Sequence, residues 1–552
     1  MPLLHDAFEA TAARLPAKTA LVCGAKRLSY GALLGRTRAI AAGLRQHGVE
    51  RGDRVVLTLE PGFTYVAALH AVLRLGAVMV PLPPTTKPER LAFALEDTEA
   101  TAWLGEPRGV AESAAQLRAR RPGLRCAWAP DADTLDPASN DARCASAIDQ
   151  DLAAILYTSG STGRPKGVML SHHNMRSAWA SVQAYLGLEE GDTIGLALPP
   201  TFSYGLYHVL MGLGLGATVV LDRQAAFVLK VAQTLERERV TVFPAVPTLL
   251  SALLQLPALA GMDHGALRTM TSAAAALPTA LVPRIAAAWP GARFFSMYGM
   301  TECKRISYLP PHELAQRPAS VGRGLPHQDH WLVDADGRRL GPGNHTGELV
   351  VRGSHVMRGY WRRPDETAAR LRPATDGAGR TVHGGSPVLH TGDLFRTDEA
   401  GYLHFVARMD DIIKSRGEKV APREVEEAIH ELAQVASCAV VGVPDAQLGE
   451  AVKAFVTLRP GTSLVARDIV RHCLARLENH MAPKFVEFVD VLPTTESGKV
   501  RHATLRQRPD SPRHLPPDSA PDVPPDKSSS LGAADTGRCD RVCVGPLPPL
   551  NR

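Results

Sequence analysis

The stretch Tyr157-Thr158-Ser159-Gly160-Ser161-Thr162-Gly163-Arg164-Pro165-Lys166-Gly167-Val168 decides the interpretation of this sequence. It follows the apolar run 152–156, which is typical of a buried strand. Glycines let backbone N–H groups turn toward an anion, Ser and Thr hydroxyls donate to phosphate oxygens, and a lysine adds a mobile charge. The stretch therefore predicts a phosphate-binding loop built from Thr158, Ser159, Gly160, Ser161, Thr162, Gly163 and Lys166.

Two other kinds of loop share part of this composition. A P-loop has the pattern G-x-x-x-x-G-K-[ST], whereas here two residues separate Gly160 from Gly163 and Arg-Pro separates Gly163 from Lys166. Pro165 also stands where a P-loop helix would begin. A Gly/Ser/Thr-rich segment is most often a plain surface loop, but the strand-like run before it and the apolar residues 168–170 after it favour a binding loop.

The twelve residues resemble the signature loop of the adenylate-forming superfamily, which comprises acyl-CoA synthetases, adenylation domains of nonribosomal peptide synthetases and firefly luciferase. The resemblance covers roughly residues 5–505 and is greatest to a fatty-acyl-CoA ligase. It implies an α/β fold with a large N-terminal domain of parallel-rich sheets and crossover helices, residues 1–409, and a small mobile α/β C-terminal lid, residues 410–505. The Pro-rich residues 506–552 lack apolar periodicity and are predicted to be a disordered tail.

Strand–helix–strand patterns support the same fold class from the residues alone. Helical spacing of apolar residues at 33–46 and 65–75 alternates with strand-like runs at 55–59 and 77–82. This rhythm predicts a parallel sheet with crossover helices.

Composition excludes several classes of protein. The chain of 552 residues has 45% hydrophobic and 21% charged residues, which is ordinary for a globular enzyme of two or three units. Its net charge of +6 is spread out, without a basic block interleaved with aromatics, so we expect no nucleic-acid partner. The eight scattered cysteines predict reduced thiols and a cytoplasmic location. We expect neither a signal peptide nor a membrane span, since no run of about eighteen apolar residues occurs.

A second predicted site is the stretch 294–302, a strand that ends in a glycine turn followed by a hydroxyl and a carboxylate. Thr-Glu after glycine is more often a helix cap, but the full match of 298–302 resembles the superfamily's motif. The resemblance implies that Glu302 is a catalytic residue and the ligand of Mg²⁺, which prefers one or two carboxylates plus phosphate oxygens. Thr301 would donate to phosphate, and Tyr298, Gly299 and Met300 would contact the nucleotide.

The pocket for the carboxylic acid is predicted around the aromatic turn 199–206, with Phe202, Tyr204 and Gly205 as its walls. Aromatic residues are by default core residues, but in the superfamily this turn walls the substrate. Amino-acid-activating members carry an aspartate here; this chain has none between Asp192 and Asp222. A buried, unpaired ammonium is costly, so we expect an acid without an α-amino group. The stretch 271–278 has alanines where relatives usually carry a glycine pair, and Ala274 and Ala275 are predicted to contact the nucleotide.

The remaining predicted residues come from the C-terminal third and rest on the resemblance. It implies that Asp393 and Arg408 bind ribose, that Asp410 is the hinge, and that Lys414 and Gly417 enter the site for the thioester step. It also makes Lys499 the catalytic lysine of the adenylation step. Read without the resemblance, 407–426 is a charged connection before an amphipathic helix, and Lys499 is a solvated lysine in a polar turn.

Together these residues predict a ligase that uses ATP, Mg²⁺ and coenzyme A. A carboxylic acid, which we predict to be a fatty acid, would attack the α-phosphate of ATP to give an acyl-adenylate, and a thiol would then displace AMP. We favour free coenzyme A because no carrier domain follows the lid. The alternative is an acyl- or aryl-AMP ligase that loads an acyl carrier protein. Oxidative light emission, a P-loop kinase, and a degenerate binding protein are weaker hypotheses; the last predicts loss of Glu302, Asp393, Arg408 or Lys499, and all four are present.

Overall fold

A computed structural model describes residues 3–130, 146–158, 165–221, 227–341, 343–374, 380–382, 387–416, 418–445, 447–495 and 500–508. The predictions for several residues fall outside these ranges: Ser159, Gly160, Ser161, Thr162, Gly163, Gly417, Lys499 and the tail from residue 509.

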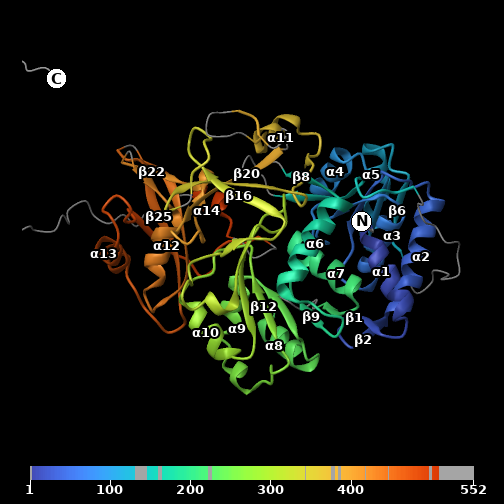
Figure 1. The fold of residues 1–552 in the computed structure, drawn as a ribbon, viewed down its shortest axis with the longest axis horizontal. Helices are drawn as coiled ribbons and strands as arrows, with labels where there is room; N and C mark the ends of the chain where they lie inside the picture. Colours follow the sequence, from blue (N-terminus) through green and yellow to red (C-terminus); the bar gives the residue numbers. More distant parts are fainter. Residues whose placement is uncertain are drawn as a thin grey trace, which may run out of the picture. The chain divides into compact units, whose positions relative to one another are not determined.

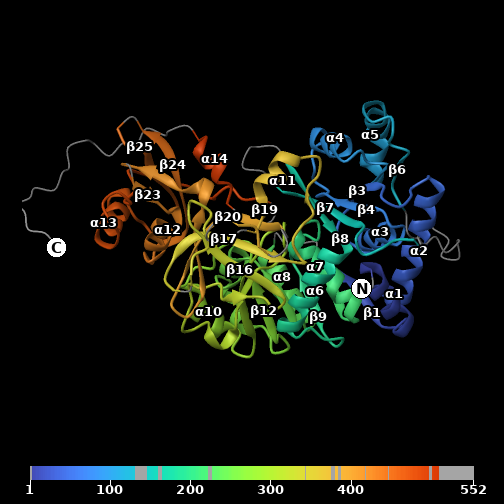
Figure 2. The same cartoon turned by 45° about the horizontal axis from the view of Figure 1, so that its top comes forward.

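A seven-stranded sheet is built mainly from the first 170 residues and contains the predicted strand before the phosphate loop (Figure 2). It is parallel from β7 through β6 and antiparallel at β7–β8 and β8–β18. Its order is β18 (Gly359–Tyr360), β8 (Lys166–Ser171), β7 (Leu152–Thr158), β4 (Val78–Pro81), β3 (Arg54–Thr58), β5 (Ala102–Gly105) and β6 (Cys126–Trp128).

A nine-stranded sheet combines β1 and β2 from the start of the chain with strands after residue 192, and it is parallel from β13 to β1 with antiparallel edges at both ends (Figure 1). Its order is β15 (Arg323–Gly324), β14 (Ser307–Leu309), β13 (Arg293–Tyr298), β12 (Thr269–Ser272), β11 (Val242–Ala245), β9 (Thr193–Leu196), β10 (Thr218–Leu221), β1 (Thr19–Cys23) and β2 (Lys26–Ser29).

Helices cover both faces of these two sheets, as the alternation of strand side chains requires. On β3, Val55 and Leu57 belong to the core shared by the two sheets, whereas Val56 belongs to the core on the opposite face. The shared core contains α1 (Leu4–Arg14), α2 (Tyr30–Gln46), α3 (Phe63–Arg74), α6 (His172–Leu186) and α7 (Ser203–Leu215). The outer faces are covered by α4 (Pro88–Asp97) and α5 (Pro107–Arg120) on the seven-stranded sheet, and by α8 (Val228–Arg237), α9 (Pro247–Leu253) and α10 (Leu281–Ala288) on the other.

A third, antiparallel sheet carries Asp393 and Arg408. It comprises β16 (Gln328–Val333), β17 (Thr346–Gly353), β20 (Pro387–Thr397), β19 (Leu371–Pro373) and β21 (Leu403–Arg408). In the sequence, the strand β18 and the helix α11 (Pro364–Arg370) lie between β17 and β19. Read from the sequence alone, 390–395 is expected to be a loop and 398–405 a hairpin. The strands β20 and β21 do form a hairpin, but the loop is wrong, because β20 pairs with β17 on one side and β21 on the other and so satisfies its backbone in a ladder.

The residues after the short helix η4 (Met409–Asp411) form a small sheet with helices. Its two hydrophobic clusters contain only residues from Ile413 onward. The elements are β22 (Ile413–Ser415), β23 (Glu418–Val420), α12 (Pro422–His430), β24 (Val435–Asp445), β25 (Gly449–Leu458), α13 (Ala466–Arg476), β26 (Phe485–Phe488) and α14 (His502–Arg506). The mixed α/β architecture is therefore confirmed, while the domain boundary at 409/410 stays a prediction.

The aromatic turn predicted at 199–206 is only partly a turn, since α7 begins at Ser203 and places Tyr204 and Gly205 in its first helical turn. A Cβ on Gly205 would lie 2.6 Å from the carbonyl oxygen of Pro199, so only glycine allows the helix to start this close to the preceding chain.

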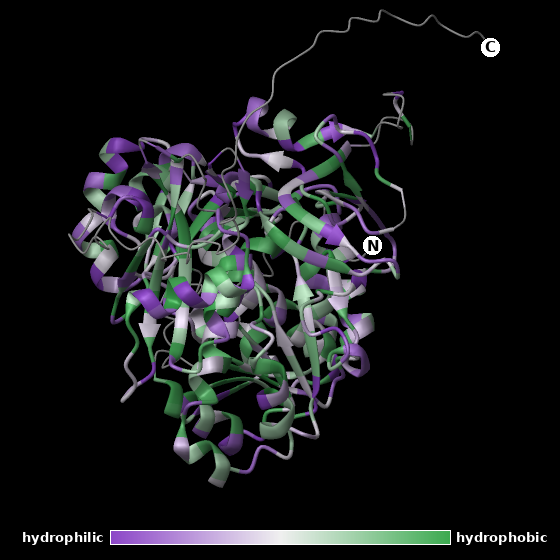
Figure 3. Ribbon diagram, turned by 90° about the vertical axis from the view of Figure 1, so that its left-hand side faces the viewer, coloured by the Kyte–Doolittle hydropathy of each residue, from purple (hydrophilic) through white to green (hydrophobic). Residues whose placement is uncertain are grey.

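Hydrophobic colouring follows the inner strands and hydrophilic colouring the peripheral helices and loops (Figure 3). Within the described residues, no helix combines the length and apolarity needed to cross a membrane.

Candidate active site

The two ends of the predicted phosphate loop are paired strands. Thr158 on β7 is the register partner of Lys166 on β8, and we call this antiparallel pair of strands the phosphate hairpin. A strand, and not a helix, follows Pro165, which agrees with the exclusion of a P-loop. The Lys166 ammonium lies 2.7 Å from Glu366 and 5.5 Å from the ring centre of Tyr360. An incoming phosphate would therefore compete with Glu366 for this cation.

Glu302 is held next to this hairpin. Its carboxylate is 7% exposed and accepts a hydrogen bond of 2.8 Å from the Tyr360 hydroxyl. Tyr360 lies on β18, which pairs with β8, so one tyrosine contacts both Glu302 and Lys166. Burial, and then the charge of Glu302, raises the pKa of Tyr360, which keeps it a donor. Sequence reasoning missed Tyr360 because it is 58 positions from Glu302, and only the β8–β18 pairing brings the two together.

A second carboxylate, Asp393, is bound in a similar way. The Tyr298 hydroxyl donates to Asp393 at 2.5 Å, and Arg408 Nε lies 3.2 Å from its other oxygen. Asp393 and Arg408 are register partners on β20 and β21. Burial and the adjacent Asp393 raise the pKa of Tyr298. The Arg408 side chain is 53% exposed, so its guanidinium is accessible to a ligand.

The turn after β13 joins these two carboxylate sites. A Cβ on Gly299 would lie 2.2 Å from the carbonyl oxygen of Lys304, so glycine is required where the chain folds back on itself. Met300 and Thr301 are half-buried on this turn between Tyr298 and Glu302. The structure thus brings together 298–302, Asp393, Arg408 and the ends of the phosphate loop.

The predicted acid pocket lies where α7 begins and β12 ends. The Tyr204 hydroxyl and Thr271 Oγ1 are 2.6 Å apart, which connects the two elements. Phe202 is half-buried immediately before α7. Beyond β12, Ala274 is half-buried with φ of +76°, in the left-handed region, and Ala275 is exposed.

Two basic residues that sequence reasoning missed are buried against this pocket. The exposed fractions of Lys304 and Arg305 are 4% and 3%. The Lys304 ammonium donates to the carbonyl of Ser203 at 3.1 Å and lies 4.4 Å from the ring centre of Tyr207. Burial, and secondly the charge of Arg305, puts the pKa of Lys304 well below its ordinary value. Their position between the apolar residues Cys303 and Ile306 was the available signal of burial.

The residues present fit a magnesium ion bound largely by the nucleotide. The described residues contain no cluster of three or more His, Cys, Asp or Glu that could enclose a metal ion. Mg²⁺ usually takes one or two carboxylates and completes its shell with phosphate oxygens and water. The buried carboxylate of Glu302 beside the phosphate hairpin fits that role.

The hinge residues lie at the start of the C-terminal sheet. Asp410 is exposed in η4. Lys414 is exposed on β22, and its backbone N–H donates to Glu450 at 2.7 Å. With Gly417 and Lys499 outside the described residues, the roles assigned to this group stay predictions.

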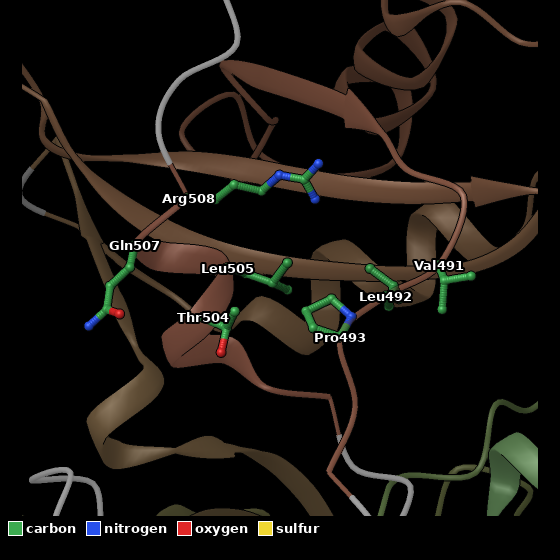
Figure 4. A pocket seen from close by; sticks show the side chains of 7 residues that line it. All are labelled: Val491, Leu492, Pro493, Thr504, Leu505, Gln507 and Arg508. Atoms are coloured by element: carbon green, nitrogen blue, oxygen red, sulfur yellow. The ribbon is translucent and has the colours of Figure 1, made fainter.

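A cavity of about 550 Å³ lies elsewhere, in the C-terminal part (Figure 4). It contains none of the predicted site residues, so we do not assign it to the reaction. It is lined by Val491, Leu492, Pro493, Thr504, Leu505, Gln507 and Arg508.

The parallel-rich sheets and the two tyrosine-bound carboxylates beside a phosphate hairpin define a nucleotide-using α/β enzyme. The chain belongs to the AMP-binding enzyme family, whose model matches residues 8–361. The model of the AMP-binding enzyme C-terminal domain matches residues 424–499. The resemblance to the adenylate-forming superfamily is thereby confirmed.

Named relatives are similar over most of their lengths. The chain is 35% identical to the feruloyl-CoA synthase of Amycolatopsis sp., covering 89% of this chain and 96% of the relative. It is 29% identical to the long-chain-fatty-acid–CoA ligase of Bacillus subtilis, and the match covers 93% of this chain and 95% of that relative. The crystal structure of ATP-bound MatB from Rhodopseudomonas palustris superposes with a TM-score of 0.81 at 30% identity, covering 91% and 98%.

Proposed function

We propose that this AMP-forming acid–thiol ligase activates a carboxylic acid without an α-amino group and transfers it to coenzyme A. A carboxylate oxygen attacks the α-phosphorus of ATP, and the bond to pyrophosphate breaks. The thiol sulfur then attacks the acyl carbon, AMP leaves, and the thiol proton passes to solvent. The observation that carries the proposal is the pair Glu302 and Asp393, each bound by a tyrosine hydroxyl, with Glu302 linked to the phosphate hairpin through Tyr360.

Each residue would act mainly by position and charge in the adenylation step. Asp393 can accept from both ribose hydroxyls, and Arg408 can donate to the sugar, because its guanidinium is more than half exposed. Lys166 and the hairpin loop would take the phosphates, and Thr301 would donate to them. Tyr298 would offer its ring near adenine, and Lys499 would supply a further cation.

Glu302 would hold Mg²⁺, which supplies neutralisation of phosphate charge when bound. The hydroxyl of Tyr360 would orient the Glu302 carboxylate, since it donates to one oxygen and leaves the other available.

The thioester step would use a second arrangement of the C-terminal part, with Asp410 as the hinge and Lys414 and Gly417 entering the site. The separate hydrophobic clusters after Ile413 support residues 410–505 as a distinct unit. Substitution Asp410→Pro would fix φ at the hinge. It should impair thioester formation far more than adenylation, and equal loss of both would contradict the hinge.

The acid itself is assigned only by class. The named relatives include a feruloyl-CoA synthase and a long-chain-fatty-acid–CoA ligase, so both aryl and fatty acids are candidates. The fatty-acid prediction made from the sequence therefore stays a prediction. The sequence has no acidic residue between Asp192 and Asp222 that would pair an α-ammonium, which supports the exclusion of amino acids.

The test is pyrophosphate release with ATP and Mg²⁺ across acetate, octanoate, palmitate, benzoate and amino acids, with and without coenzyme A. We expect turnover with a fatty or aryl acid that rises with coenzyme A. Adenylate formed without such acceleration would favour a carrier-protein acceptor, and dependence on an amino acid would contradict the pocket assignment.

Lys499→Ala tests the catalytic lysine. A cation about 4 Å from a negative charge on the transferring phosphate, with an effective dielectric near 20, stabilises that charge by roughly 4 kcal/mol. This energy corresponds to about a thousandfold in rate. We expect that loss in pyrophosphate release, while Lys230→Ala, which removes an exposed lysine on α8, serves as the control. Near-normal release from Lys499→Ala would refute the assignment.

A further inference from the structure

The proposed acid pocket contains a buried positive charge that the two-step reaction does not use. Arg305 lies with its guanidinium carbon 5.2 Å from the ring centre of Tyr204, the residue predicted to wall the pocket. Lys304 lies 5.2 Å from the same ring centre. Both side chains therefore lie beside Tyr204, the residue predicted to wall the acid pocket.

No counter-charge compensates Arg305 within the part of the chain that the structure describes, whereas the lowered pKa of Lys304 favours its neutral amine. The ion pairs among described residues include none that joins Arg305 or Lys304 to a carboxylate. Glu302, the adjacent acid in the sequence, is bound by Tyr360 instead. A buried charge without a partner is destabilising by several kcal/mol, so a protein that retains Arg305 here is expected to use it.

Hydrogen-bonding capacity is also unused next to this charge. Arg305 Nε, Thr201 Oγ1 and His208 Nε2 are buried and have no hydrogen-bond partner among the described residues. Thr201 precedes α7, and His208 lies one turn after Tyr204 on the same helix. The charge of Arg305 acts on His208, and a guanidinium can donate to both oxygens of one carboxylate.

We propose that the acid activated by this enzyme carries a second carboxylate at the end of its tail, and that Arg305, assisted by Lys304, selects for it. The inference rests on the proposed function, because it concerns the substrate of that same site. The Arg305 side chain shares a hydrogen bond with Tyr185, a neutral partner that leaves its charge uncompensated. An acid with a purely apolar end would leave the guanidinium buried without a counter-charge, whereas a terminal carboxylate supplies that charge and acceptors.

The test compares matched acids that differ only at the far end: octanoate with octanedioate, and benzoate with benzene-1,4-dicarboxylate. Monomethyl octanedioate keeps the length and polarity but removes the second charge. We expect kcat/KM for pyrophosphate release to be roughly tenfold to a hundredfold higher for each diacid, the range for a hydrogen bond to a charged group. Equal or better turnover of the monoacids by the wild type would overturn the inference and leave the ligase assignment intact.

The variant Arg305→Gln should abolish the diacid preference. Arg176→Gln is the matched control, since it removes a partly buried arginine that lies 4.2 Å from the ring centre of Trp179 on α6, away from the pocket. The control should keep the wild-type ratio. A diacid preference that persists in Arg305→Gln would show that another group selects the substrate.

Binding gives a readout that depends on neither catalysis nor the variant's folding. Octanedioate should raise the melting temperature of the wild type more than octanoate at equal concentration. If no acid supports pyrophosphate release but octanedioate still raises the melting temperature more than octanoate, the proposed reaction is contradicted and the anion site is supported. Absence of both selective turnover and selective protection would overturn the site.

Discussion

Replacement of Ala274 by glycine should stabilise the protein. Ala274 has φ of +76°, where the Cβ of an L-residue crowds the following carbonyl at a cost of about 1–2 kcal/mol. Glycine avoids that cost but loses about 0.5–1 kcal/mol through greater freedom of the unfolded chain. The difference between these two ranges predicts a net gain of about 0–1.5 kcal/mol in the free energy of unfolding, with its centre at about 0.75 kcal/mol.

The adjacent Ala275 is the matched control. It is exposed and does not have positive φ, so Ala275→Gly carries only the entropic cost and should destabilise by up to about 1 kcal/mol. Urea denaturation midpoints of the two variants should therefore shift in opposite directions from that of the wild type. A loss of stability in Ala274→Gly equal to that in Ala275→Gly would refute the reasoning from backbone strain.

Three further predictions concern individual side chains. Burial raises the pKa of Glu426 from 4.5 to about 7 in the folded chain. The protonated Glu426 carboxyl therefore contributes fully to the free energy of unfolding below pH 4.5, and this contribution is lost as pH rises through 7. Between pH 5 and 8 the free energy of unfolding of the wild type should fall by on the order of 3 kcal/mol relative to that of Glu426→Gln. Urea denaturation midpoints measure this difference. Tyr360→Phe removes the hydroxyl that donates to the buried Glu302 carboxylate. This variant should lower kcat/KM for pyrophosphate release about tenfold and raise the Mg²⁺ concentration that gives half-maximal rate. Unchanged Mg²⁺ dependence would contradict the role of Glu302. Asp393→Asn removes the charged acceptor for ribose, so the preference for ATP over 2′-deoxy-ATP should fall roughly tenfold with little change in KM for the acid; a retained preference would exclude Asp393 as the ribose ligand.

Much of the fold could be predicted because its strands and helices follow clear periodicities. The helical spacing at 33–46 corresponds to α2, and the apolar runs at 55–59 and 152–156 correspond to β3 and β7. The pattern failed at 390–393, where polar and glycine residues indicate a loop but neighbouring strands on both sides enforce a strand. It also failed at the start of α7, where Gly205 permits a close approach that sequence spacing does not reveal.

The candidate site was predictable where contiguous residues carry it and not where distant elements meet. The stretch 298–302 and the pair Asp393 and Arg408 came from local motifs, and the structure brings them together through Tyr298. Tyr360 and Arg305 were missed because their relevance depends on which side chains pack against them. A single sequence offers no direct measure of that packing.

The pairing of β18 with β8 provides an optical probe of the phosphate hairpin. Trp361 immediately follows β18, and its backbone N–H donates to the carbonyl of Gly167 on β8 at 2.7 Å. Its indole N–H donates to the carbonyl of Asp97 at 2.8 Å, so the ring spans the hairpin and α4. Any displacement of β8 on nucleotide binding would change the surroundings of this indole. Its emission therefore reports occupancy of the hairpin without a label, provided that the other five of the six tryptophans are replaced.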